Sequence, residues 1–185
     1  MWPADWTDDD LWRAAYLAHE AATVFGALMR LGLEPGRPLI VVGDGARARV
    51  AVAIGLAKGA IPSTPADAGP ASGRRIIETS GSAGGRALAL GLAGPGGAVA
   101  FVDGLDGRSI DFAPAASWNT FVTDEALLFG ATACHPDLYP ELAALVVRGQ
   151  LDLGPLVEAV SLADVVSARA DYAAGRRQTL PILRF

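Results

Sequence analysis

The sequence contains very little sulfur and imidazole. Its 185 residues include one cysteine, Cys134, and two histidines. A single cysteine excludes an internal disulfide and favours a reducing compartment, so we expect a cytoplasmic protein. One cysteine and two histidines are too few for a four-ligand structural zinc site made of cysteine and histidine alone, and we expect no bound zinc. A metal held by carboxylates is the alternative.

Positive charge and long apolar runs are also scarce. Lysine and arginine together number 15 against 20 aspartates and glutamates, for a net charge of −5, which argues against a nucleic-acid partner. The longest apolar stretch, near 87–102, is interrupted by the sequence GPGG and is too short to span a bilayer. The N-terminus, MWPADWTDDDLW, is acidic where a signal peptide would be basic. We expect neither a nucleic-acid nor a membrane partner.

Hydrophobic side chains, by contrast, are plentiful. They make up 51% of the chain, and the mean hydropathy is +0.33. A chain of this length can build one domain with a sizeable core. We predict a single domain over 1–185, in which residues 1–33 form a helical segment packed on the rest.

Strand-like and helix-like segments alternate along the chain. This alternation predicts an α/β fold with a mostly parallel sheet and helices on both faces. The expected strands lie at 39–42, 60–67, 74–79, 98–102, 107–113, 125–133 and 180–185, and the expected helices at 11–31, 47–58, 83–92, 136–148 and 162–174, the last with Ser161 as its N-cap. Pro62 and Pro65 lack the N–H that a central strand needs, so the second strand belongs at the edge of the sheet.

The segment LIVVGDGARARVAVAIG, 39–55, is typical of a dinucleotide-binding turn. Gly43 and Gly45 permit a tight turn and the close approach of a pyrophosphate, and Ala48 permits close helix–strand packing. The helix that follows would point its first N–H groups at that phosphate. The alternative is a strand–turn–helix that uses two glycines only for its geometry.

Three stretches together resemble a known family. They are GLEPGRPLIVVGDGARA, IIETSGSAGGRALALGLAGPGGAVAFVDG and ELAALVVRGQLDLGPLVEAVSLADVVSARADYAAGRRQTLPILRF. In this order they resemble the coenzyme domain of the medium-chain (zinc-type) alcohol dehydrogenases and quinone reductases, over residues 11–185. The resemblance implies a Rossmann-like domain that binds NAD. The family's catalytic zinc domain has no counterpart in this sequence, and only AGPASG stands where the family has a helix, a strand and a second helix. We therefore expect a trimmed Rossmann-like sheet.

Three charged residues near the turn decide how it is interpreted. Asp67 follows Gly43 by 24 residues, within the range expected for the acid that binds a ribose 2′-hydroxyl and selects NAD over NADP. It could equally be a solvated loop aspartate. Asp44 would repel a pyrophosphate unless it is turned outward. By resemblance, Arg47 faces the nicotinamide side, where it could block the nicotinamide ring or bind an anionic ligand as a catalytic group; alternatively, it could pair with Asp44 on the surface.

Further candidates follow the other expected strands. Ligands of open α/β sheets bind at the carboxyl ends of the strands. Asp103 could be a general base or a strand-end cap. We also expect cofactor contacts from Ser80, Gly104 and Phe129. A thiolate pair of Cys134 and His135 and phosphate contacts from Arg176 and Arg177 are weaker alternatives.

These observations favour an NAD(H)-binding, zinc-independent oxidoreductase-like protein that acts on a small biosynthetic intermediate. The alternatives are a non-redox enzyme (a cyclase, isomerase or dehydratase) and an accessory subunit that has reused the pocket. Residues 126–133 include three consecutive apolar side chains and no lysine, arginine or proline, so an exposed strand there would aggregate. We expect a homodimer formed by antiparallel pairing of this strand about a two-fold axis.

Overall fold

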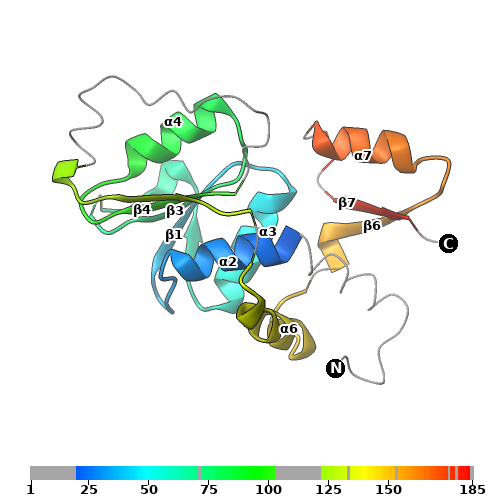
Figure 1. Cartoon of the computed structure of the whole chain (residues 1–185), viewed down its shortest axis with the longest axis horizontal. Helices are drawn as coiled ribbons and strands as arrows, with labels where there is room; N and C mark the ends of the chain where they lie inside the picture. The colour runs from blue at the N-terminus through cyan, green and yellow to red at the C-terminus, as the bar shows by residue number, and fades with distance from the viewer. Residues whose placement is uncertain are drawn as a thin grey trace.

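The computed structural model describes residues 20–70, 72–102, 122–132, 134–152, 154–174, 176–177 and 179–183. Its main element is a five-stranded sheet in the order β2-β1-β3-β4-β5, in which every neighbouring pair is parallel (Figure 1). The strands are β1 (Pro38–Val42), β2 (Ile61–Ser63), β3 (Arg75–Glu78), β4 (Ala98–Phe101) and β5 (Leu127–Gly130). The predicted α/β class with a parallel sheet is confirmed.

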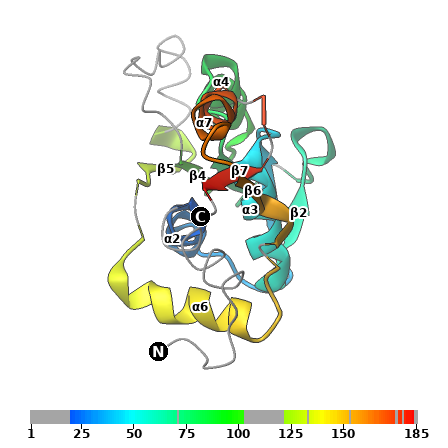
Figure 2. The same cartoon turned by 90° about the vertical axis from the view of Figure 1, so that its right-hand side faces the viewer.

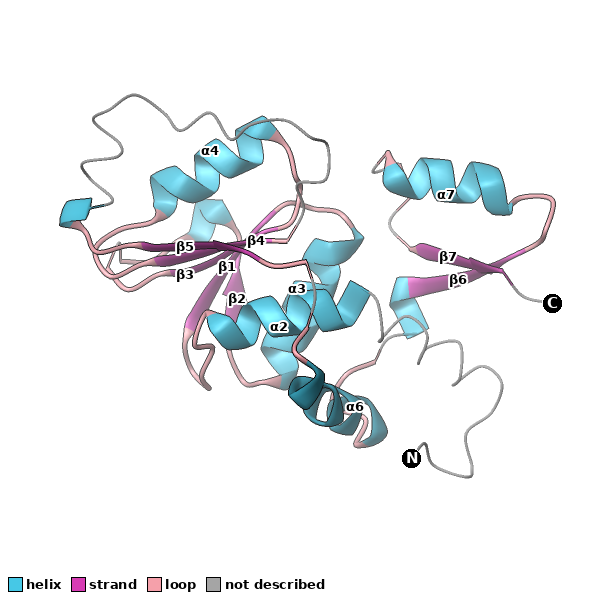
Figure 3. Cartoon of the chain, viewed as in Figure 1, coloured by secondary structure: helices cyan, strands magenta, loops and turns pink. Residues whose placement is uncertain are grey.

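Helices cover both faces of this sheet (Figures 1 and 3). On one face, α2 (Ala22–Arg30), α3 (Ala46–Ala57) and α6 (Tyr139–Val147) contribute to the larger core cluster. On the other face, α4 (Ala83–Leu92) packs on a smaller cluster of strand residues. Connections between parallel strands need such crossovers, and here α3 and α4 provide two of them.

The position of β2 follows from its prolines. β2 is an edge strand of three residues, with Pro62 opposite Leu39 of β1. A short 3-10 helix, Pro65–Asp67, follows it directly. Because proline cannot donate to a second neighbour, the sheet ends here, and the predicted edge position is confirmed.

The C-terminal residues form a separate unit of two parallel strands and a helix (Figure 2). After a short 3-10 helix, Gly154–Leu156, come β6 (Val157–Val160), α7 (Val165–Ala173) and β7 (Leu180–Leu183). The sequence predicted β7 but not β6. It also placed the N-cap of α7 three residues too early, because the helix begins at Val165 with Asp164 as its N-cap. Ser161 lies in the turn before the helix, where its hydroxyl accepts from the Asp164 nitrogen over 3.3 Å and donates to the Asp164 carboxylate over 2.6 Å.

The N-terminal helix prediction is tested only in part. Residues 11–19 lie outside the described residues, whereas six of the nine residues of α2 are buried, with Phe25 and Leu28 at 0% exposure. Gly32, with φ +66°, ends this helix as expected. The packing of 1–33 as a segment of one domain stays a prediction, and the short strand expected at 107–113 also lies outside the described residues. Among the helices described, none is long and apolar enough to cross a membrane.

Candidate functional site

The glycine turn after β1 lies against the turn after β3. Gly43 has φ +119°, and a Cβ atom there would lie 2.4 Å from Thr79 Oγ1 and 3.2 Å from the Ser80 nitrogen. The Thr79 hydroxyl donates to the Val42 carbonyl over 2.9 Å. Two independent constraints therefore favour glycine at position 43: the positive φ angle, and the lack of room for a Cβ atom beside Thr79.

Gly45 opens the N-terminus of α3. It is the N-cap of that helix, and a Cβ atom there would meet nothing within 4 Å. The first N–H groups of a helix have no partner within the helix and attract anions. Close helix–strand packing is provided further along by Gly55, where a Cβ atom would lie 3.0 Å from Leu39 and 3.1 Å from Pro62. Ala48 is buried, as the turn pattern predicted.

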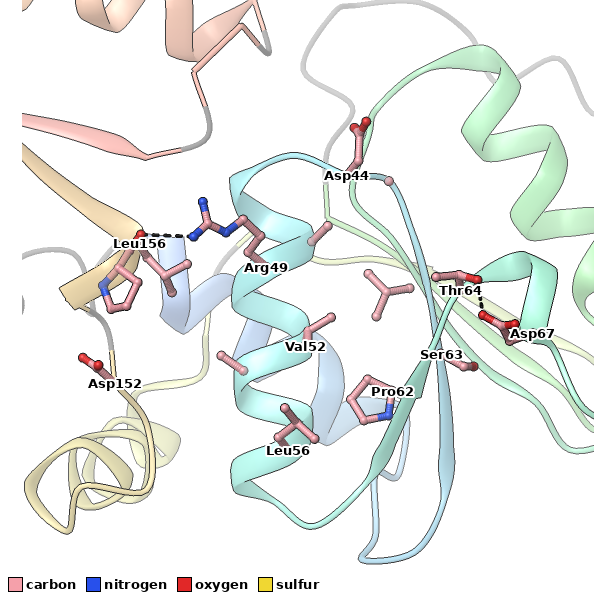
Figure 4. A pocket seen from close by; sticks show the side chains of 15 residues that line it. Asp44, Arg49, Val52, Leu56, Pro62, Ser63, Thr64, Asp67, Asp152 and Leu156 are labelled. Carbon is pink, nitrogen blue, oxygen red and sulfur yellow. Dashed lines mark hydrogen bonds between the residues drawn. The ribbon is translucent and has the colours of Figure 1, made fainter.

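One hollow, which we call the α3 groove, runs along the outer side of α3 and encloses about 670 Å³ (Figure 4). Asp67 lies at the side of this groove, next to Thr64 (Figure 4), and one of its carboxylate oxygens accepts a hydrogen bond of 2.6 Å from the Thr64 hydroxyl. Val52 and Leu56 line the lower part and are 37% and 62% exposed. The groove is lined by Val41, Gly43, Asp44, Ala48, Arg49, Val52, Ala53, Leu56, Pro62, Ser63, Thr64, Asp67, Asp152, Pro155 and Leu156.

A second hollow, which we call the α7 cleft, lies on the other side of the turn and encloses about 540 Å³. The turn and the end of β3 form one wall, and α7 with the residues after it forms the other. Asp44 lines both hollows, so they meet at the glycine turn. The cleft is lined by Glu20, Asp44, Gly45, Ala46, Arg47, Thr79, Ser80, Arg169, Tyr172, Ala173, Ala174 and Arg177.

Arg47 pairs with Glu20 and not with Asp44. Its Nε donates to Glu20 Oε2 over 2.7 Å, and a terminal nitrogen donates to the Val102 carbonyl over 3.2 Å. The surface pair with Asp44 was therefore a wrong alternative, because Arg47 turns toward a partly buried carboxylate beside α2. Figure 4 shows the Asp44 carboxylate pointing away from the α3 groove, which removes one objection to a phosphate at the turn.

Glu78 was missed by the sequence analysis and organises the turn after β3. It is 0% exposed, and its Oε1 accepts from the Ser80 nitrogen over 2.8 Å and from the Ser80 hydroxyl over 2.5 Å. Ser82 in turn caps α4 by accepting from the Gly85 nitrogen. Glu78 therefore fixes the position of Ser80 in the α7 cleft. The signal in the sequence that could have identified Glu78 was its position as a carboxylate at the end of a short apolar strand.

The other candidates separate into three groups. Asp103 and Gly104 lie outside the described residues. Phe129 lines neither hollow, and the Arg30 guanidinium lies over its ring at 4.2 Å from the centroid. Cys134 is buried, and this burial raises the pKa of its thiol, while the His135 imidazole is exposed and lies near Asp137. The thiolate pair therefore has no support in this geometry. No group of three or more metal-ligating side chains occurs within the described part of the chain.

The two arginines after α7 have different surroundings. Arg176 pairs with Asp171 over 2.7 Å and does not line the cleft. Arg177 lines the cleft and donates to Glu158 Oε2 over 2.5 Å. Of these two arginines, Arg177 is therefore the one placed to contact a ligand in the cleft.

Comparison with known proteins locates the fold but not the activity. No protein-family model matches the sequence, and no curated protein matches it. Solved structures do match. They include benzyl alcohol dehydrogenase from Acinetobacter calcoaceticus (TM-score 0.78, 18% identity, 100% of this chain and 59% of that one) and galactitol-1-phosphate dehydrogenase from Escherichia coli (0.75, 19%, 98% and 62%). The chain has the fold of the medium-chain alcohol dehydrogenases.

The predicted resemblance is thus confirmed for the fold. The chain spans about six tenths of the length of these dehydrogenases. One further match is a putative zinc-binding dehydrogenase from Sinorhizobium meliloti that was solved with NADP bound (TM-score 0.72, 16% identity, 90% of this chain and 58% of that one). At such identities the likeness establishes the architecture alone.

Proposed function

We propose that this chain binds NAD(H) across the glycine turn and forms the nucleotide-binding part of an oxidoreductase. The observation that carries the proposal is the meeting of two hollows at a turn with a free helix N-terminus. A dinucleotide has two halves joined by a pyrophosphate, and this arrangement offers a place for each half and for the joint. The fit of the pyrophosphate rests on the empty space around Gly45.

The adenosine half would occupy the part of the α3 groove beside Asp67. The Asp67 carboxylate would accept hydrogen bonds from the ribose hydroxyls and would repel a 2′-phosphate, which favours NAD(H) over NADP(H). β2 is the edge strand, and no α-helix among the described residues packs beyond it, so adenine would be covered on one side only. We therefore expect weak binding, with a dissociation constant above the low micromolar range.

The nicotinamide half would extend toward the α7 cleft and the ends of β3 and β4. The nicotinamide ring supplies a hydride acceptor or donor when it is bound. Ser80, fixed by Glu78, would contact the ribose or the substrate, and Arg47 would lie beside the reacting end. Asp103 and Gly104 remain candidates at the end of β4.

A second function is favoured by one specific observation. Arg47 brings a guanidinium into the cleft at the position that, by resemblance, faces the nicotinamide. A pocket reused for an anionic substrate, in a non-redox enzyme or an accessory subunit, would explain a charged group there. Failure of every nicotinamide dinucleotide to bind would favour this alternative.

Calorimetric titration with NAD⁺ and NADP⁺ tests the proposal. We expect weak binding of NAD⁺ and weaker binding of NADP⁺. Asp67→Asn should reduce the preference for NAD⁺, because it removes the charge that repels the 2′-phosphate. Asp124→Asn is the matched control, since Asp124 precedes β5 at the opposite edge of the sheet and lines neither hollow. A Kd in the low micromolar range would contradict the expected weakness, and tighter binding of NADP⁺ by the unaltered protein would contradict the role of Asp67.

A further inference from the structure

The wall that α7 contributes to the cleft is basic. Arg169, Tyr172 and Ala173 stand at positions i, i+3 and i+4 of the helix and therefore share one face. Arg177 continues this wall after the helix ends. The opposite wall carries the glycine turn, Thr79 and Ser80, so a molecule in the cleft would lie between hydroxyl groups and guanidinium groups.

The three arginines of the cleft differ in how their charges are compensated. Arg47 is paired with Glu20, and Arg177 with Glu158. Arg169 has no hydrogen bond or ion pair with any residue that the structure describes. Asp44 is likewise without one in the described part of the chain, and no ion pair joins it to Arg169 across the cleft. Arg169 therefore offers an uncompensated positive charge to a ligand.

We infer that the α7 wall binds the anionic group, a carboxylate or a phosphate, of the small molecule on which this protein acts. The inference rests on the proposed function, in which the cofactor phosphates use the opposite wall at the N-terminus of α3. Asp44 lines the cleft on the side of the turn and disfavours a second anion there. A substrate anion is therefore directed to Arg169, with Arg177 beside it.

The size and chemistry of the cleft fit such a substrate. Its volume of about 540 Å³ is within the range of sites for small molecules. A guanidinium forms two parallel hydrogen bonds with a carboxylate or phosphate, which fixes orientation as well as charge. With its anionic end at Arg169, the other end of the molecule would lie toward Ser80 and the glycine turn.

The test uses inorganic phosphate and malonate as probes in calorimetric titrations, with and without saturating NAD⁺. We expect at least one probe to bind, with a similar Kd in both conditions. Arg169→Gln should weaken this binding about tenfold, since it removes a charge-assisted bidentate contact. Arg176→Gln is the matched control, because Arg176 lies in the same segment and does not line the cleft. Preference for phosphate or for malonate distinguishes the two kinds of anion.

Three results would overturn the inference. One is the absence of binding by both probes. Another is equal binding by the unaltered protein and Arg169→Gln. The third is displacement of the probe by NAD⁺ together with weaker NAD⁺ binding in Arg169→Gln, which would assign Arg169 to the cofactor phosphates. If NAD⁺ fails to bind but the probe still depends on Arg169, the proposed cofactor is refuted and the anion site stands.

Discussion

The five-stranded sheet and the C-terminal unit (β6, α7 and β7) are both built from parallel strands and helices. Their residues are buried to very different degrees. In β1 four of five residues are buried, and in β3 three of four. In β6 none is buried, and in α7 only Ala168 is. The apolar residues Leu162 and Val166 of this unit are 73% and 77% exposed.

This difference indicates which part of the chain contributes most to folding stability and which part can adjust to a bound ligand. The sheet has a cluster of buried apolar side chains on each face. The C-terminal unit is attached through a few partly buried side chains, such as Leu180 and Ile182, and through the Arg49 hydrogen bond to the Pro155 carbonyl. The α7 cleft lies between the well-packed turn and the weakly packed helix. Regions of low local stability are where proteins place parts that move on binding.

The largest expected effect separates the two regions directly. Ile77→Ala removes a side chain with 0% exposure from the middle of β3 and should lower the free energy of unfolding by about 3–4 kcal/mol. Val166→Ala on α7 should change it by less than about 0.5 kcal/mol, because that side chain is mostly in water. Urea denaturation of both variants measures the difference. Similar losses would contradict the unequal burial on which the comparison rests.

The glycine turn belongs to the well-packed region and should respond accordingly. Gly43→Ala forces a side chain into a backbone with φ +119° and against the Thr79 hydroxyl, so we expect a loss of about 1–3 kcal/mol. NAD⁺ binding should also be lost. Gly45→Ala is the control for stability, since its φ is −75° and no atom lies within 4 Å of the new Cβ. Thermal melting that shows equal stabilities for the two variants would refute the close approach at Gly43.

The open edges of the two sheets provide the third contrast. β2 carries Pro62, β7 carries Pro181 and β6 carries Glu158, all of which discourage pairing with another chain. β5 carries no such residue, and its Leu127 is 53% exposed. We propose that β5 pairs antiparallel with a second copy of the chain through residues 126–133.

A charge at this edge tests the dimer. Leu127→Lys should weaken it at least about tenfold, because a lysine side chain on an edge strand discourages pairing with another chain. Leu127 suits the test better than Phe129, which is half-buried beneath Arg30. Leu88→Lys on α4 is the control, as that leucine is 46% exposed and away from the edge. Light scattering measures the mass, and a 19.0 kDa monomer at micromolar concentration would exclude the dimer.

The well-buried region was also the more predictable one. Continuous apolar runs identified β1, β3 and β4, and Pro62 located the edge, because both signals depend on local rules of strand burial and backbone hydrogen bonding. β6 was missed because its sequence, VEAV, is short, is interrupted by Glu158 and has no buried residue. The sequence analysis began α7 too early, since Ser161 caps the turn that ends at Asp164 and the helix itself begins only at Val165.

At the candidate site, residues in a local sequence pattern could be predicted, whereas contacts between residues distant in the sequence could not. Gly43, Gly45 and Asp67 follow a spacing that the turn itself requires. The partner of Arg47 is Glu20, which is 27 residues away and is brought close only by the packing of α2 against α3. Arg169 gave no signal in the sequence, because it reaches the cleft only through the position of the C-terminal unit.

The smallest expected effect is a dependence on pH confined to the C-terminal unit. The Thr179 hydroxyl and then the Arg177 guanidinium hold the pKa of Glu158 below its ordinary value of 4.5. The ionised carboxylate therefore adds stability above pH 4.5, and this stability is lost as the pH falls through the lower value in the folded protein. The effect is small because the Glu158 side chain is 50% exposed.

Hydrogen-exchange protection factors measured between pH 6 and pH 3 resolve this effect by region. Amides of β6 and β7 should lose protection as Glu158 is protonated, while amides of β3 keep theirs, because Glu158 ties β6 to Arg177 and to Thr179 just before β7. Glu158→Gln should lower protection in β6 and β7 at pH 6 and make it insensitive to acid. Glu34→Gln, on an exposed pair with Arg37, should behave like the unaltered protein. Equal acid sensitivity in Glu158→Gln and the unaltered protein would show that another group controls how firmly the C-terminal unit is attached.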